Sequence, residues 1–169
     1  MHILQVTPYF HPHFGGVESH VLGLCENLIK LGHQVEVVTS RYSRMPEIED
    51  LNGIKITRLP QWINMYNTPL VTAIQAFVRM SHADIVHVHS PPPFTERFAA
   101  KGAKESKKPL VVTHHCDLEL KGMFGNIAVN LYQSMLGKFP LEAADRVIST
   151  TNSYATTSKS LWDIDVDVV

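Results

Sequence analysis

The order of hydrophobic and polar positions along the chain predicts strands that alternate with helices. Short apolar or β-branched runs, typical of buried strands, occupy residues 2–7, 34–40, 54–59, 84–89, 109–114 and 146–150. Helical periodicity covers residues 17–31, 69–81, 94–105, 122–143 and 152–161. We expect residues 41–53 to form a loop, because they are polar and contain Pro and Gly. Gly32 should end the first helix in a left-handed conformation, and Pro69 should lie in the first turn of its helix.

This alternation predicts one α/β domain, a Rossmann-like open parallel sheet with helices on both faces. We assign residues 1–163 to the domain and interpret residues 164–169 as a final strand or as the start of an interdomain linker. In open sheets of this kind, ligands bind beyond the carboxyl ends of the strands. The functional residues should therefore lie in the segments that follow the strands.

Those segments hold the histidines that set this sequence apart. The runs FHPHFGG, HSPPPF and HHCDLELKG follow three of the predicted strands, and three close pairs of histidines lie at these strand ends, namely His11 and His13, His87 and His89, and His114 and His115. Because the carboxyl ends of parallel strands share one edge of the sheet, we expect the imidazoles to converge there.

Composition narrows the classes of function. The 15 basic and 16 acidic residues give no net field that would attract nucleic acid. Cys25 and Cys116 are far apart in the sequence, which argues against a disulfide framework and suits a reducing compartment. The apolar start is too short for a signal peptide, and no apolar run approaches the length of a membrane span. We therefore expect a cytoplasmic protein.

Gly15 and Gly16 stand at the mouth of the first helix. Glycine permits positive φ and close approach of a ligand to the backbone, and the free amides of a helix start favour phosphate. The spacing matches neither G-x-G-x-x-G nor a P-loop. An ordinary connection from strand to helix explains the same two glycines, and Glu18 can simply complement the helix dipole.

The other histidines differ in what they can do. His87 and His89 are two residues apart and share one face of their strand, where His87 is the more structural of the two. In HHCD, a neutral imidazole can bond a sugar hydroxyl or couple to Asp117, while the second histidine can be a packed side chain. His20 lies off the apolar stripe of the first helix, at the surface near the cleft.

Trp62, Ile63, Met65 and Tyr66 form an apolar stretch in a predicted loop. They can pack against the loop itself or form a lip that touches lipid.

The stretches GGVESHVLGLCENLIKLGHQVEVVTS, DIVHVHSP and VVTHHCD resemble the amino-terminal half of family-4 retaining glycosyltransferases, which have the GT-B fold with two facing Rossmann-like domains. The resemblance covers essentially the whole chain. Within that family, GGVESH and LPQWINMYN are most similar to enzymes that glycosylate phosphatidylinositol or related lipids.

The resemblance implies a role for individual positions. Gly15 and Gly16 would contact the diphosphate of a nucleotide-sugar donor. His115 matches the family's histidine at the reacting sugar, where it would contact a sugar hydroxyl or stabilise developing charge. The acceptor would be met by Tyr9, His13 and Glu18, with His89 and Asp117 as further candidates on geometry.

The resemblance also implies the reaction and its partners. A hexosyl group would pass from a nucleotide-diphosphate sugar to a lipid or saccharide acceptor with retention, through attack and departure on the same face, without metal or cofactor. Relatives carry a second, nucleotide-binding domain, and this sequence stops at Val169, where the linker to it would begin. We therefore expect a truncated chain that is inactive alone, located in the cytoplasm with possible peripheral contact on the inner face of the membrane.

Two other interpretations stay open. Paired histidines with Asp117 nearby would suit a metal-dependent hydrolase, although no HExxH is present and three pairs exceed the needs of one ion. A non-catalytic Rossmann module that binds a nucleotide or sugar is the other, weakened by the missing G-x-G-x-x-G.

Overall fold

The computed structural model describes residues 1–65, 68–91, 93–117 and 137–169. Its strands are His2–Val6 (β1), Gln34–Arg41 (β2), Ile48–Leu51 (β3), Ile54–Pro60 (β4), Ile63–Met65 (β5), Thr68–Leu70 (β6), Ile85–Ser90 (β7), Leu110–His114 (β8), Arg146–Ser149 (β9) and Val166–Val168 (β10). Its helices are Gly16–Lys30 (α1), Ala73–Met80 (α2), Pro93–Glu105 (α3), Lys138–Glu142 (α5), Asn152–Thr157 (α6) and the 3₁₀ turn Lys159–Leu161 (η2).

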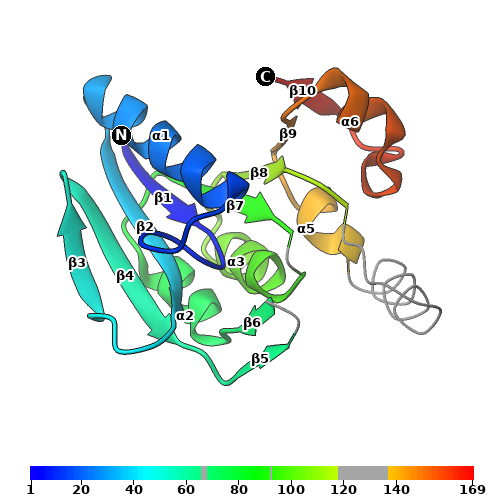
Figure 1. Ribbon diagram of the computed structural model, residues 1–169. Helices are drawn as coiled ribbons and strands as arrows, with labels where there is room; N and C mark the ends of the chain where they lie inside the picture. Colours follow the sequence, from blue (N-terminus) through cyan, green and yellow to red (C-terminus); the bar gives the residue numbers. More distant parts are fainter. Residues whose placement is uncertain (66–67, 92, 118–136) are drawn as a thin grey trace.

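Eight of these strands form one twisted sheet in the order β10-β9-β8-β7-β1-β2-β4-β3 (Figure 1). All neighbours in it are parallel except β3 and β4, which form an antiparallel edge. The predicted α/β fold with an open, parallel sheet is therefore confirmed. Strands β5 and β6 pair with each other in a separate ribbon.

The sheet is covered on both faces, and each face has its own hydrophobic core. Alternate residues of each strand point to opposite faces, so Leu4 and Val6 of β1 join the core beneath α2 and α3. On the other face, Val21 and Cys25 of α1 are fully buried against residues of β2 and β4. The α1 face also carries the polar side chains of β1, β7 and β8, because those positions alternate with the apolar ones.

The point where the chain reverses its direction across the sheet lies between β1 and β7. From β1 the chain moves outward through β2 to β4, and it then crosses to the other side of β1 to form β7 and β8. The segments after β1, β7 and β8 thus end side by side at one edge, where open α/β sheets bind their ligands. The strand order therefore allows these three segments to converge, as predicted.

Several predicted elements differ from those observed. Residues 41–53 contain β3, which joins β4 through a hairpin with positive φ at Asn52 and Gly53, the pattern of a type I′ turn. Pro69 belongs to β6, and the helix expected from that region begins only at Ala73. Gly32 has a φ of 84° and ends α1 as predicted. Most of the helix expected at 122–143 lies outside the described residues, as does Tyr66.

The end of the chain adds a strand to the sheet. Residues 152–161 are split into α6 and η2, and Val166–Val168 then pairs in parallel with β9. Residues 164–169 therefore contain a short strand.

Candidate active site

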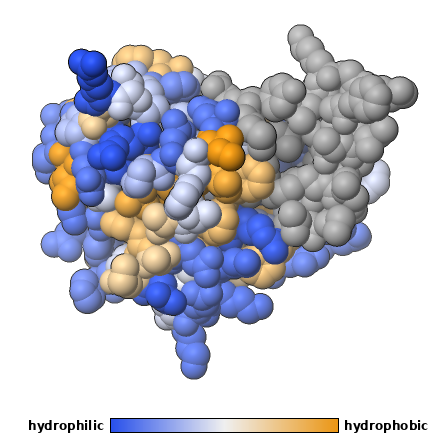
Figure 2. Space-filling model, turned by 90° about the horizontal axis from the view of Figure 1, so that it is seen from below, coloured by the Kyte–Doolittle hydropathy of each residue, from blue (hydrophilic) through white to orange (hydrophobic). Residues whose placement is uncertain are grey.

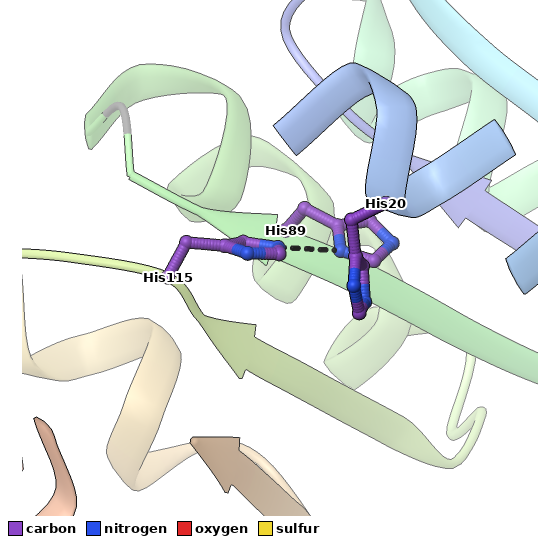
Figure 3. A group of neighbouring side chains, drawn as sticks. All are labelled: His20, His89 and His115. Atoms are coloured by element: carbon purple, nitrogen blue, oxygen red, sulfur yellow. Dashed lines mark hydrogen bonds between the residues drawn. The ribbon is translucent and has the colours of Figure 1, made fainter. Parts of the chain in front are cut away.

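His89 and His115 meet at the carboxyl edge of the sheet. His89 of β7 is fully buried, and its Nδ1 lies 3.1 Å from Nε2 of His115, which follows β8 (Figure 3). The Nε2 of His89 donates to the Oε1 of buried Gln5 on β1, at 2.8 Å. A neutral imidazole carries one proton, so Nδ1 of His89 is bare and accepts the bond from His115 Nε2–H. His115 therefore presents its own Nδ1 as an acceptor.

Two more imidazoles complete this group. His20, one turn into α1, is exposed, and its ring centroid lies 5.0 Å from that of His115 and 6.1 Å from that of His89. His87 packs at 4.5 Å from His89 and bonds Thr113 Oγ1 through its Nε2. The structure thus brings His89 and His115 together with the start of α1, as the strand order required.

Burial keeps the imidazoles of His87, His89 and His115 neutral. Desolvation, followed by the charges of His20 and His115, lowers the pKa of His87 from 6.5 to about 4. Desolvation and then His20 and His114 lower the pKa of His115, also to about 4. The pKa of His89 lies well below its ordinary value for the same reason, since the ring is completely buried among other imidazoles. Near neutral pH, the site offers uncharged donors and acceptors.

Acid is expected to destabilise the fold through His87. At pH values between the ordinary pKa of His87, 6.5, and its folded pKa of about 4, His87 is protonated in the unfolded chain but neutral in the folded protein. The contribution of His87 to the free energy of unfolding should therefore be constant above about pH 7 and fall as the pH drops. At ~1.4 kcal/mol per pH unit, His87 alone accounts for a loss of about 2 kcal/mol by about pH 5.

Urea unfolding in metal-free buffer at about pH 7 and about pH 5 measures this loss. His87→Asn should remove about 2 kcal/mol of the pH dependence, whereas His82→Asn, at an exposed position, should retain all of it. Equal acid losses in wild type and His87→Asn would contradict the assignment.

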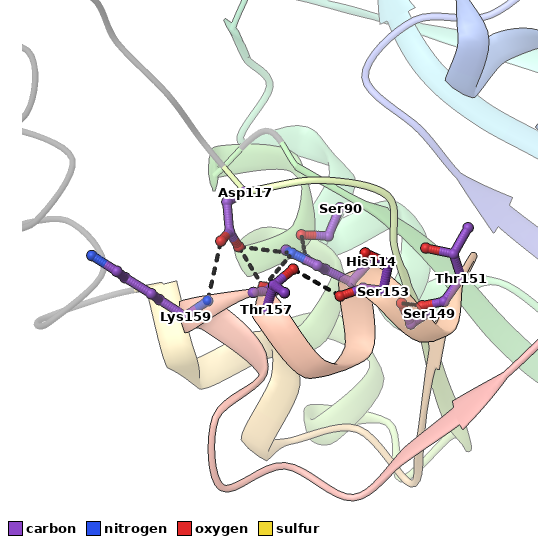
Figure 4. A network of polar contacts seen from close by, with 9 residues as sticks. Ser90, His114, Asp117, Ser149, Thr151, Ser153, Thr157 and Lys159 are labelled. Carbon is purple, nitrogen blue, oxygen red and sulfur yellow. Dashed lines mark hydrogen bonds and ion pairs between the residues drawn. The ribbon is translucent and has the colours of Figure 1, made fainter.

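His114 points away from this group and into a separate polar network (Figure 4). Its Nε2 lies 3.1 Å from Asp117 Oδ1, which also accepts from Ser158 Oγ at 2.6 Å, and Asp117 Oδ2 accepts from the amide of Lys159. Burial would raise the pKa of Asp117, but hydrogen bonds from Ser158, Ser160 and His114 outweigh it and lower this pKa. Asp117 thus couples to His114 and fastens the segment after β8 to η2.

The predicted acceptor residues gather in the loop after β1. The rings of Tyr9 and His13 stack at 4.7 Å, and His13 Nδ1 lies 3.1 Å from Glu18 Oε1, at an angle unsuited to a hydrogen bond. Tyr9 is buried, and its hydroxyl accepts from Asn64. His13, Phe14 and Glu18 line one side of a pocket of about 190 Å³ beside α1.

The two glycines do not have the positive φ that their flexibility permits. Gly15 is extended, with a φ of −162°, and a Cβ there would overlap the carboxylate of Glu18. Gly16 begins α1, and a Cβ there would meet no atom within 4 Å. No side-chain hydrogen bond from the N-cap residue caps the helix at Gly15, so the first amides of α1 lack that partner.

The sequence profile of Glycosyltransferase Family 4 matches residues 14–169. This range includes α1 and the four histidines of the site, His20, His87, His89 and His115, whereas Gln5 of β1 precedes it. The chain belongs to glycosyltransferase family 4. The resemblance drawn from the glycine pair and the strand ends is therefore confirmed.

The relatives of this family-4 chain include the phosphatidylinositol N-acetylglucosaminyltransferase GPI3 subunit of Saccharomyces cerevisiae, 29% identical over 158 residues, or 89% of this chain and 34% of that protein. A phosphatidylinositol N-acetylglucosaminyltransferase of Homo sapiens is 37% identical over 97 residues, or 52% of this chain and 20% of that protein. The narrower likeness to phosphatidylinositol glycosyltransferases is confirmed. The chain spans about a third or less of the length of these curated relatives.

A solved structure, that of sucrose-phosphate synthase from Thermosynechococcus elongatus, superposes on the family-4 chain with a TM-score of 0.66. The match covers 99% of this chain and 87% of the other at 16% sequence identity. At that identity the likeness shows the fold alone, and it confirms the Rossmann-like half of a GT-B fold.

Two residues of the site were not among those predicted from the sequence. Gln5 lies in an apolar strand run, and a polar amide in such a run is itself a signal of a buried bonding partner. The sequence places His20 near the cleft but indicates no role for it. The roles predicted for the glycines, His115 and the acceptor residues stay predictions.

Proposed function

We propose that this chain is the acceptor-binding half of a retaining glycosyltransferase, which moves a sugar from a nucleotide-sugar donor to a lipid or saccharide acceptor. The observation that carries the proposal is the position of His115. Its imidazole follows β8 at the topological switch point, in ring contact with His20, one helical turn from the open start of α1. A donor diphosphate at that helix start would hold its sugar within reach of His115.

The donor phosphates would meet the backbone at Gly16 more than at Gly15. The Glu18 carboxylate lies over Gly15 and would repel a phosphate there, whereas Gly16 is open and begins a fifteen-residue helix with uncapped amides. A second domain of GT-B type would supply the remaining contacts to the nucleotide. No resident metal or cofactor is required in this scheme.

The acceptor would enter beside the loop after β1. Glu18 and His13 line the pocket there and can exchange hydrogen bonds with hydroxyl groups, while buried Tyr9 holds the His13 ring by stacking. Phe14, Trp62 and Ile63 expose 78%, 77% and 53% of their surface, which suits peripheral contact with a lipid surface. Among the described residues, no helix is long and apolar enough to cross a bilayer.

On the face seen from below, hydrophobic residues lie among hydrophilic ones (Figure 2). Membrane contact through this face would therefore be shallow and would rest on a few side chains.

The reaction would proceed on one face of the sugar. The bond from the anomeric carbon to the diphosphate oxygen breaks while the acceptor oxygen attacks from the same side, and the acceptor's proton passes to the departing phosphate. The bare Nδ1 of His115 would accept a hydrogen bond from a donor-sugar hydroxyl and so fix the sugar for this step. Binding of the acceptor and positioning of the sugar would be this chain's share of catalysis.

The test is an assay of the full-length protein with vesicles that contain phosphatidylinositol and with nucleotide-activated N-acetylglucosamine as the first donor, chosen from the names of the relatives. We expect a glycosylated lipid by mass spectrometry and a retained anomeric configuration by NMR. An inverted product would refute the retaining mechanism. No transfer from a panel of nucleotide sugars to lipid or saccharide acceptors would refute the proposed function.

A further inference from the structure

Three imidazoles from different elements converge, and each brings one ring nitrogen close to those of the other two. His20 comes from α1, His89 from β7 and His115 from the segment after β8 (Figure 3). One ring nitrogen of each lies within 4.8 Å of those of the other two. Within the described ranges, no other group of three or more such side chains meets this spacing.

The spacing fits a tetrahedral metal ion. Zinc binds imidazole nitrogen at ~2.0–2.1 Å, which places two ligand nitrogens of a tetrahedron about 3.3 Å apart. The Nδ1 of His89 and the Nε2 of His115 are already 3.1 Å apart. His20 is exposed on its helix, so rotation of its side chain can bring its nitrogen into the third position at little cost.

The buried side of the group has the support that metal ligands need. A ligating histidine generally donates its other N–H to a carbonyl or carboxylate, which fixes the tautomer and the ring. Gln5 Oε1 accepts from Nε2–H of His89 at 2.8 Å and leaves Nδ1 bare. Gln5 is itself fully buried, so this support is rigid.

We propose that His20, His89 and His115 bind one transition-metal ion of the Zn²⁺ class, and that the bound ion inhibits the protein by occupying His115. The proton that His115 holds on Nε2 moves to Nδ1 of the same ring through water, so both histidines stay neutral on binding. The ion takes three protein nitrogens and leaves the fourth position to water. An all-imidazole set favours Zn²⁺, Co²⁺, Ni²⁺ or Cu²⁺ over Mg²⁺ or Ca²⁺, which prefer oxygen. Binding stands independently, whereas inhibition rests on the proposed function.

Titration of the purified protein with Zn²⁺ by calorimetry tests the binding, and Co²⁺ absorption reports the geometry of the site. We expect one ion per chain and the intense visible bands of tetrahedral cobalt. His20→Ala should weaken Zn²⁺ binding at least ~10-fold while His82→Ala, an exposed control, leaves it unchanged. Circular dichroism verifies the fold of each variant. Absence of binding, or equal affinity in wild type and His20→Ala, overturns the site.

The inhibitory role is tested in the same transfer assay as the proposed function. Zn²⁺ should inhibit wild type, a chelator should restore the activity, and His20→Ala should need at least ~10-fold more Zn²⁺ for equal inhibition. Transfer that Zn²⁺ binding leaves unchanged overturns the inhibitory role. Transfer that rises with Zn²⁺ overturns it as well. If the protein shows no transfer either with or without metal, the proposed function fails, while the titration still decides the binding.

Discussion

Replacing His115 by alanine is expected to lower the turnover of the proposed transfer reaction by about 10²–10³-fold, because a positioned hydrogen-bonding group at the reacting sugar would be lost. The donor KM should change much less, since the diphosphate would bind at the start of α1 rather than at the imidazole. Initial rates at varied donor concentration measure both parameters. His82→Ala, at an exposed position before the amino end of β7, should retain wild-type turnover.

The nature of the His115 contact can be tested with a second variant. His115 Nε2 is bonded to His89, so Nδ1 is the atom left for the sugar. The amide oxygen of asparagine lies near the position of an imidazole Nδ1 and is also an acceptor. His115→Asn should therefore recover at least ~10-fold of the turnover that His115→Ala loses. Turnover of His115→Ala within about twofold of wild type would remove His115 from the reaction altogether.

The elements with strong periodicity could be predicted from the sequence, as α1 and β2 illustrate. β3 could not be predicted from hydrophobic alternation, because IEDL is an edge strand with two acids and little buried surface. Its turn residues, Asn52-Gly53, carry the hairpin signal that hydrophobicity lacks. Proline is common both in the first turn of a helix and in an edge strand, so the sequence alone does not assign Pro69. Its pairing with Asn64 in the structure places it in a strand.

The part of the candidate site that lies at the strand ends could be predicted from the sequence. Parallel order places the ends of β7 and β8 together, so the meeting of His89 and His115 follows from topology. The separation of His114 from His115 does not follow from their sequence, since neighbouring residues at a strand end point to opposite faces and only packing selects their partners. His20 belongs to the site because α1 packs with this ring beside His115, a tertiary contact that helical periodicity does not contain.

Replacing Arg58 by alanine is expected to reduce the free energy of unfolding by about 3 kcal/mol or more, because it removes a large buried side chain together with its hydrogen bonds and the cation of a half-buried ion pair. Arg58 of β4 is only 1% exposed, and its Nη2 lies 2.6 Å from Glu49 Oε2 of β3. The same guanidinium donates to the carbonyl oxygens of His11 and Pro46, at 2.8 and 3.3 Å. Alanine would leave a cavity and three unpaired acceptors. Urea unfolding at about pH 7 measures the loss.

The chain supplies a matched control for this effect. Arg41 pairs with Glu47 at 3.4 Å, but both side chains are largely in solvent, at 38% and 63% exposure. Arg41→Ala should cost no more than about 0.5 kcal/mol, since water replaces the lost partner. Arg58→Met fills the cavity without the charge and should be less destabilising than Arg58→Ala. Because His11 opens the loop that leads to Gly15, Arg58 holds the proposed donor site as well as the sheet edge. Equal stability of Arg58→Ala and Arg41→Ala would show that burial adds nothing to this pair.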